Sequence, residues 1–352
     1  MTDWLTTREA VKRALGAAGT DLHPTIDRHI AAASHELQES INRKFIPRTA
    51  TYYFDGKGKR SLWLPPSEEG DLLAVTTLKV DENGDGTYEK TLAANTDYWL
   101  WPDNGTPKNR IDINPESAQL SVFPQGRRRV EIVGRFAYSE DTKAAGSVSS
   151  GLTPGTSATN FVCSNAALID VGDTLLIESE QLFVSERTAT SLGIAGLLIS
   201  GIAADVSATE LEIATPGVAI VGEVLLVDSE RMLVVDTPGA SAFVIVQRAY
   251  DGSTLASHAS AAQAYTYRSL TVVRGVNGTT AAAHPDGTAI RKYVVPEDIE
   301  RQVRAEAIYG IKADQSGQTG LVGGGDSAQR VNSWPLRNQR QAVISRYRVP
   351  VV

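Results

Sequence analysis

The side chains best suited to metal or acid–base chemistry are spread thinly along the chain. The five histidines are His23, His29, His35, His258 and His284. None of them forms the i, i+4 pair or the HExxH motif that holds zinc on a helix. His258 and His284 occupy equivalent positions of an internal repeat, which favours a role in the fold, such as bonding a turn backbone. We therefore expect no metal site.

Two groups of acidic residues could carry chemistry. Asp81–Gly86 (DENGDG) resembles the start of a calcium loop, with oxygen-bearing side chains at positions 1, 3 and 5 and glycine at position 6. Position 12 is Leu92 instead of a bidentate glutamate, so a hairpin turn is the favoured interpretation. Glu180 and Glu230 stand at matching repeat positions beside serine, and we expect solvated strand residues there and not an acid–base pair.

The sequence contains no recognisable catalytic motif. A Gly-x-Ser-x-Gly elbow, a P-loop and a Rossmann fingerprint are all absent. Cys163, the only cysteine, aligns with Ile213 in the repeat, which predicts a small core residue and not a nucleophile. A single cysteine also excludes an intrachain disulfide. We expect no catalytic, cofactor or metal site, and we expect that the protein is not an enzyme.

Composition places the chain among ordinary folded proteins. Its 352 residues, 42% hydrophobic and 21% charged, suffice for about two domains with real cores. No apolar run approaches the ~20 residues that span a bilayer, and the start of the chain lacks the pattern of a signal peptide. The net charge of −7 is concentrated in residues 148–294, which hold fourteen acidic and seven basic residues. This shift indicates a separately folded segment.

Both ends of the chain have helical patterns. Thr6 and Glu9 have the spacing of a capping box, and Gly16 is a natural stop for the first helix. A second helix is predicted to begin near Pro24, with one apolar stripe formed by Ile26, Ile30, Ala33, Leu37 and Ile41. Helical signals return after residue 295 and in a short segment that contains Leu336, Ile344 and Tyr347.

Residues 49–138 have the pattern of a small antiparallel β unit. Thr51–Phe54 and Ser61–Leu64 flank the turn-forming Asp55–Gly58, which predicts a hairpin. Further predicted strands are Val75–Val80, Tyr98–Trp101, Arg110–Ile113, Leu120–Phe123 and Val130–Val133.

The middle of the chain contains a repeat with two different offsets. Residues 157–184 align without gaps with residues 207–234, an offset of fifty, whereas Arg248–Thr254 match Arg274–Thr280 at an offset of 26. Two offsets fit one module nested inside a copy of itself, with the insertion at a hairpin tip, where extra sequence is tolerated. We name the predicted units the outer module (157–190 plus 269–294) and the inner module (206–268).

Short motifs outside the middle segment carry a family resemblance. They are Glu39–Pro47, Tyr53–Gly56, Leu62–Pro65, Thr96–Pro102, Val130–Tyr138 and Pro296–Ile299, the last followed by a helix and a basic tail. Together they resemble the head-to-tail connector (adaptor, or head completion) proteins of tailed bacteriophages over about 1–140 and 295–352. The large segment 148–294 is a departure from the shortest members. The combined prediction is an α+β chain: a helical adaptor frame with a β unit (1–147 plus 295–352) and an inserted all-β domain of two nested modules (148–294) that stands off the frame.

The resemblance implies a structural virion protein. It implies a homo-oligomeric ring, a dodecamer, that joins the portal to the tail and surrounds the DNA channel. The implied partners are other copies of the chain, the portal protein, tail or tail-terminator (stopper) proteins, and DNA that passes without sequence-specific binding. The implied location is the head–tail interface of the virion, and the host cytoplasm during assembly. A β-rich tail protein that binds a receptor or carbohydrate is the alternative.

The C-terminal segment is predicted to bind partners. Residues 330–352 contain five arginines and no acidic residue, interleaved with large apolar side chains. Arginine and aromatic residues are typical interface anchors. We expect the binding residues to be Arg330, Trp334, Arg337, Arg340, Tyr347 and Arg348. The alternative is an ordinary helix packed on its own subunit.

The acidic modules are expected to face away from DNA.

Overall fold

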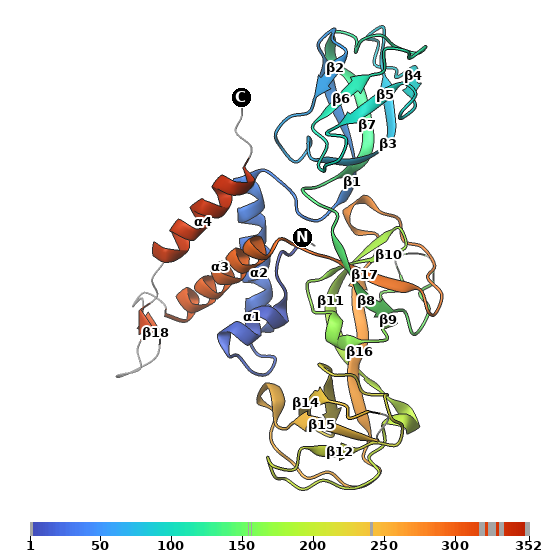
Figure 1. The fold of residues 1–352 in the computed structure, drawn as a ribbon. Coiled ribbons are helices and arrows are strands. Elements are labelled where there is room, and N and C mark those ends of the chain that lie inside the picture. Colours follow the sequence, from blue (N-terminus) through green and yellow to red (C-terminus); the bar gives the residue numbers. More distant parts are fainter. Residues whose placement is uncertain are drawn as a thin grey trace.

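A computed structural model of the chain describes residues 3–153, 155, 157–239, 242–316, 321–322, 329–330 and 334–348. For residues 321, 322, 329, 330, 334 and 335 only the backbone is described. Helices and several antiparallel sheets occur together (Figure 1), which confirms the α+β class at that level. A helical layer lies to one side, and β-rich parts follow one another along the other side.

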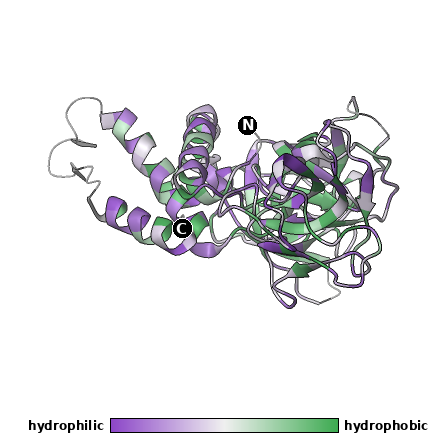
Figure 2. Ribbon diagram, turned by 90° about the horizontal axis from the view of Figure 1, so that it is seen from above, coloured by the Kyte–Doolittle hydropathy of each residue, from purple (hydrophilic) through white to green (hydrophobic). Residues whose placement is uncertain are grey.

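The helical layer is formed by segments from opposite ends of the chain. Its helices are α1 (Arg8–Leu15), α2 (His23–Ile41), α3 (Glu297–Ser316) and α4 (Trp334–Tyr347). The predicted apolar stripe of α2 is buried, from Ile26 to Ile41, and it packs against α3 through Ile299, Val303, Ala307 and Ile311. Seen from above, the layer stands beside the β-rich part and does not cover it (Figure 2).

The start of α1 differs from the predicted capping box. Thr7, and not Thr6, is the N-cap, and its hydroxyl accepts a hydrogen bond from the Ala10 amide. The Thr6 hydroxyl instead donates to Glu300 of α3 at 2.6 Å. Gly16 ends the helix in the left-handed conformation, as predicted. The first turn is therefore fixed partly by contacts with distant segments, which local spacing does not reveal.

The β unit consists of two small sheets that share one core. The first sheet has the order β1 (Arg48–Gly56), β7 (Gly126–Phe136), β3 (Leu72–Val80), β4 (Lys90–Leu92), and the second has the order β2 (Ser61–Trp63), β6 (Arg110–Ile113), β5 (Tyr98–Trp101). Large apolar side chains from both sheets, among them Leu78, Ile111, Phe123 and Phe136, fill the space between them. Alternation of inward apolar and outward polar residues along each strand produces this arrangement.

Two predictions within the β unit are wrong. Thr51–Phe54 and Ser61–Leu64 do not form a hairpin, because β1 pairs with β7 and β2 pairs with β6. Residues Lys57–Arg60 instead carry the chain from one sheet to the other, so that Phe54 and Leu62 meet only in the core. Leu120–Phe123 is not a strand, although Leu120 and Phe123 are buried as an apolar run requires.

A ten-stranded antiparallel sheet follows the β unit. Its strands are β8 (Thr142–Ser147), β9 (Asn160–Val162), β10 (Thr174–Ile177), β11 (Glu180–Ser191), β12 (Glu210–Glu212), β13 (Val224–Val227), β14 (Glu230–Asp236), β15 (Phe243–Gln247), β16 (Ala264–Val273) and β17 (Ala289–Tyr293). Their order is β12–β15–β14–β13–β16–β11–β10–β17–β8, and β9 pairs with β16. β8 lies before residue 148 and still belongs to this sheet.

The strand pairing repeats at the two offsets found in the sequence. Leu175 of β10 pairs with Lys292, and Leu225 of β13 pairs with Thr266, shifts of fifty and 26 residues. β16 is continuous: its beginning pairs with β13 of the inner module along one edge, and almost its whole length, from Tyr265 to Val273, pairs with β11 along the other edge. Two separate apolar cores result, one from residues 145–184 and 270–290, the other from residues 198–264.

The modules do not stand off the helical layer as expected. The buried Arg8 of α1 binds Asp27 of α2 at 2.6 Å and Glu186 of β11 at 2.9 Å. Lys12 reaches Asp251 of the inner module at 3.0 Å, and the Arg8 amide donates to the Val171 carbonyl. Ionic contacts through α1 therefore join the layer to both modules.

The Arg8 contact predicts a measurable loss of stability. Replacing Arg8 with methionine leaves two carboxylates facing a partly buried apolar group, and we expect a loss of about 2 kcal/mol in the free energy of unfolding. Arg28, which forms an exposed pair with Asp314, is the matched control, and Arg28→Met should cost less than about 0.5 kcal/mol. Chemical denaturation of both variants checks this, and equal stabilities would contradict it.

Candidate functional site

The predicted C-terminal binding segment is largely the helix α4, which packs on its own chain. Val343 and Tyr347 enter the core formed with Leu37, Phe45 and Ile299. Burial, with the Asp298 carboxylate beside it, raises the pKa of Tyr347 well above its usual range. The phenol donates to Asp298 at 2.7 Å, and its ring meets Phe45 edge to face. Tyr347 is thus a core residue and not the exposed anchor that we expected.

The predicted arginines differ in what they leave for a partner. Arg340 is occupied internally: it donates to the Ser40 hydroxyl at 3.0 Å and lies 3.4 Å from the Glu306 carboxylate. Arg337 and Arg348 are exposed. Arg330 lies on the short strand β19 (Gln329–Arg330), paired with β18 (Leu321–Val322), and Trp334 begins α4; their side chains fall outside the described residues.

A groove beside Arg337 separates α4 from α2 and α3. It has a volume of about 300 Å³ and is lined by Ala32, Tyr309, Gly310, Leu336 and Arg337, among others. His29 and Glu306 border it. Burial raises the pKa of Glu306, against the opposing effect of the Gln302 hydrogen bond. The accessible part of the predicted site is therefore Arg337, Arg348 and this groove.

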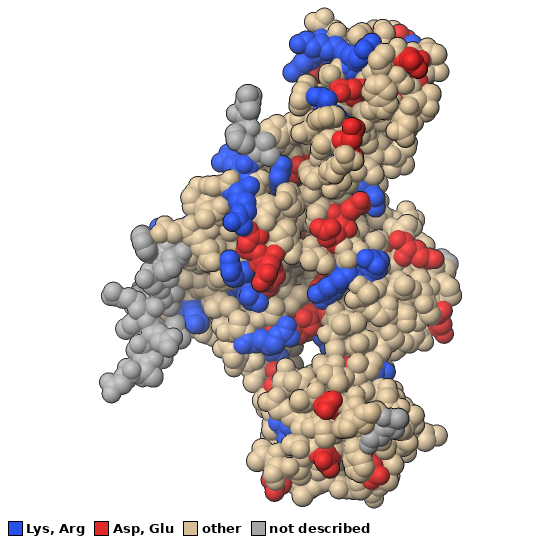
Figure 3. Space-filling model, in the orientation of Figure 1, with Lys and Arg blue, Asp and Glu red and all other residues tan. Residues whose placement is uncertain are grey.

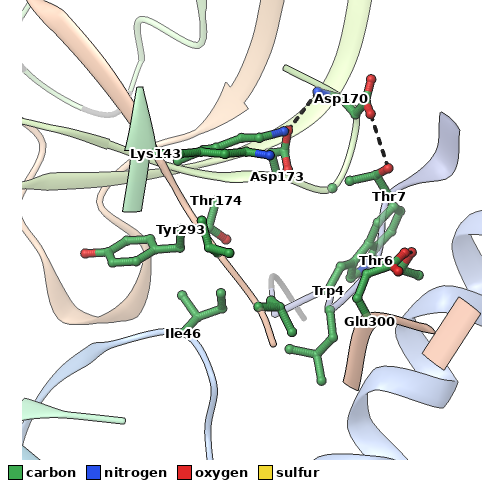
Figure 4. Close-up of a pocket in the computed structure, with 15 residues that line it drawn as sticks. Trp4, Thr6, Thr7, Ile46, Lys143, Asp170, Asp173, Thr174, Tyr293 and Glu300 are labelled. Carbon is green, nitrogen blue, oxygen red and sulfur yellow. Dashed lines mark hydrogen bonds and ion pairs between the residues drawn. The ribbon is translucent and has the colours of Figure 1, made fainter. Parts of the chain in front are cut away.

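A second hollow, of about 200 Å³, lies where the chain start meets the outer module and α3 (Figure 4). Several of its polar residues are paired with one another: Lys292 binds Asp173 at 2.6 Å, and Thr6 donates to Glu300. The Thr174 hydroxyl, which also lines the hollow, is buried without a hydrogen-bond partner. Burial raises the pKa of Asp173, and Lys292 opposes that shift. The paired residues Lys292–Asp173 and Thr6–Glu300 thus join parts of the fold across the hollow.

The most elaborate polar site is a buried cluster that occurs twice. In the outer module, Glu180 accepts two hydrogen bonds from Arg274 (2.7 Å each), two from backbone amides (2.9 and 3.1 Å) and one from His284 Nε2 (2.8 Å). In the inner module, Glu230 receives the same set from Arg248, from two amides and from His258. Neither glutamate side chain is exposed, so the expectation of solvated strand residues is wrong.

Each cluster extends to a second carboxylate. His284 Nδ1 lies 2.9 Å from Glu178, and His258 Nδ1 lies 2.7 Å from Asp228. Both ring nitrogens of each histidine thus lie within hydrogen-bond distance of a carboxylate. The expected role in the fold holds for both histidines, but their partners are acidic side chains and not turn backbones.

The hydrogen bonds that Glu180 and Glu230 accept determine the pKa of each carboxyl and therefore its chemistry. Burial alone would raise the pKa of Glu180 and of Glu230, but the hydrogen bonds from arginine, backbone amides and histidine outweigh it and lower each pKa to about 2. A carboxylate with such a pKa and a filled set of donors is a poor proton acceptor at neutral pH. The clusters therefore cross-link the final turn of each module to its β-hairpin.

Sequence reasoning missed two further features. Glu223, unexposed and equivalent to Asp173, binds Arg268 at 2.7 Å and accepts the Ala166 amide, so it ties the inner module to the outer one.

On the outer face of the β2–β6–β5 sheet, the Arg110 guanidinium lies between the rings of Trp63 and Trp101, 4.9 and 4.8 Å from their centres. The alternation of Trp63, Trp99 and Trp101 with buried leucines was the available signal.

The Asp81–Gly86 segment forms the predicted turn between β3 and β4. Asp81 accepts the amides of Gly84 and Gly86, at 2.5 and 3.1 Å. Carboxylate oxygens of Asp81, Asp85 and Glu89 lie within 4.8 Å of one another, but the Arg129 guanidinium is already 3.2 Å from Asp81. Turn formation accounts for these contacts.

Cys163 is buried, as predicted, and burial raises its pKa to about 11, so the thiolate does not form readily at neutral pH.

Comparisons with protein-family models, with curated proteins and with solved structures found no match for this chain. Among the described residues, no helix combines the length and apolar character needed to cross a bilayer.

The twin clusters predict how stability depends on acid. A glutamate whose pKa falls to about 2 on folding contributes stability above its unfolded pKa of about 4.5, and this contribution is lost as the pH falls from there towards 2. Glu230→Gln should lower stability at pH 7 by about 3–5 kcal/mol, because Arg248 stays buried without its counter-charge. Its stability should also fall less steeply below pH ~4.5 than that of the wild type.

The exposed Glu210 supplies the control for this comparison. Glu210→Gln should leave both the stability at pH 7 and the acid profile unchanged. Thermal unfolding between neutral and acid pH measures both quantities. A Glu230→Gln protein as stable as the wild type, with the same acid profile, would show that the cluster is not a cross-link.

Proposed function

We propose that the protein is a structural component of a tailed-phage virion, a head-to-tail adaptor that assembles as a ring between portal and tail. One observation carries the proposal. The segments that bear the family resemblance, 1–45 and the region after 295, lie far apart in sequence yet pack into one helical layer. Such a layer, joined to the β unit by the chain around Ile46, supports the helical frame that the resemblance implies.

The distribution of charge supports a structural role. The buried ionisable groups described above are bonded to one another, in the twin clusters, at Arg8 and at Lys292. These groups hold parts of the fold together, which supports a structural role. In this proposal, residues 148–294 are an insertion of two nested modules carried by the frame.

Assembly tests the proposal directly. Purified protein, alone and mixed with its cognate portal, should form rings of uniform size, with twelve copies expected, when measured by native mass spectrometry. A protein that stays monomeric or trimeric in both samples would contradict the adaptor role.

A second candidate function, that of a receptor- or carbohydrate-binding tail protein, is supported by one specific observation. Trp63, Trp99 and Trp101 are 62%, 44% and 45% exposed on one face of a small sheet. Exposed aromatic rings beside an arginine are typical of binding surfaces. A trimer that binds cells or glycans would favour this candidate.

Arg337, beside the groove, and Arg348, just after the end of α4, predict a docking defect. Arg337→Glu with Arg348→Glu should leave thermal stability within about 0.5 kcal/mol of the wild type, because both side chains are exposed. Affinity for the portal should fall at least about 30-fold, as expected for arginine anchors. Arg13→Glu with Arg301→Glu, an equal charge change on α1 and α3, is the control. Equal portal binding by both double variants would show that the α4 surface is not the docking element.

A further inference from the structure

The β unit ends in a strongly basic tip formed by two adjacent loops. The tip comprises Lys57, Lys59, Arg60, Arg127 and Arg128, all exposed. The loops are held together by pairing of Gly56 with Gly126 and by a hydrogen bond from the Phe123 amide to the Lys59 carbonyl. Figure 3 shows Lys and Arg side chains gathered at this end of the β unit, the end farthest from the inner module.

These five cations differ from most others in the protein because their side chains are not paired with carboxylates; the nearby Asp55 carboxylate accepts the Arg128 backbone amide at 2.8 Å. Within the described part of the chain, none of the five forms an ion pair. The Arg128 side chain lies over the Tyr53 ring, at 4.2 Å, and not against a carboxylate. Arg129, the next residue, is by contrast paired with Asp81. Five like charges held together at a tip create a local positive potential in a protein of net charge −7.

The local backbone is suited to close approach by a large ligand. Lys57–Arg60 consists of lysine, glycine and arginine only, without an apolar anchor. Gly58 adopts a positive φ of 66°, and a Cβ at Gly56 would collide with the Pro124 carbonyl, so glycine is required for this tight, projecting loop. The tip therefore offers mainly charge; the exposed apolar side chains near it are Tyr53, beneath Arg128, and Val122, next to Phe123.

We propose that this tip binds the phosphate backbone of double-stranded DNA. Lysine is depleted at protein–protein interfaces, whose affinity depends on buried aromatic and apolar anchors. Phosphates of a duplex, by contrast, repeat every ~1.7 Å along the axis and are contacted by lysine, arginine and backbone amides without sequence readout. The tip has this composition. The inference deepens the adaptor proposal by naming the residues that would meet DNA.

Salt dependence of binding provides the test. Fluorescence anisotropy with a random-sequence duplex measures the affinity of the free chain at increasing salt. Five phosphate contacts predict a slope of about −4.5 for log K against log[salt], or a loss of about 500-fold between ~50 and ~200 mM salt. In Lys59→Gln/Arg60→Gln/Arg127→Gln, two remaining contacts predict a slope of about −1.8 and a loss of only about 12-fold, with weaker binding at low salt.

Arg13→Gln/Arg28→Gln/Arg301→Gln, with the same change in net charge on the helical layer, should bind as the wild type does. The inference is overturned if the wild type does not bind the duplex at ~50 mM salt, or if both triple variants bind equally well. It is also overturned if polyglutamate binds the tip as tightly as DNA does, because the tip would then be a site for acidic protein. Ring formation is measured separately with the portal, so a failure of the adaptor proposal is distinguishable from a failure to bind DNA.

Discussion

The architecture of the modules depends on burying a carboxylate without leaving it unpaired. Removing a charge from water is costly unless a counter-charge and hydrogen bonds replace the solvent. Glu180 and Glu230 meet this requirement with an arginine, a histidine and two backbone amides each. The donors come from the turn that ends each module, so the glutamate fixes that turn against the hairpin at its base. Because β16 belongs to both modules, the two cross-linked modules share one continuous strand.

Elements whose structure depends on the local residue pattern were predicted correctly from the sequence. The stripe from Ile26 to Ile41 and the strand around Val75–Val80 followed from periodicity and burial. The partners of β1 and Glu180 did not, because they lie more than seventy residues away in sequence. The repeat nevertheless contained a usable signal for the clusters: a glutamate recurs at one offset, and an arginine and a histidine recur at the other. Three recurring ionisable residues indicate one shared site, whereas the glutamates taken singly indicate solvated strand residues.

Charge is distributed unevenly along the molecule. The β unit carries the basic tip at one end of the molecule, and the inner module lies at the other end (Figure 3). The inner module, residues 206–268, holds seven acidic residues and three basic ones. The helical layer lies beside the region between them (Figure 1). In a ring, this polarity would favour one orientation around a polyanion, with the tips near DNA and the acidic modules far from it.

A cryo-electron microscopy map of the protein assembled on its portal, with DNA in the channel, tests this account most directly. The account predicts a ring in which helical layers of neighbouring copies are in contact, the basic tips face the lumen and the inner modules lie at the outer radius. Inner modules lining the lumen, or a portal complex without a ring of this protein, would contradict it.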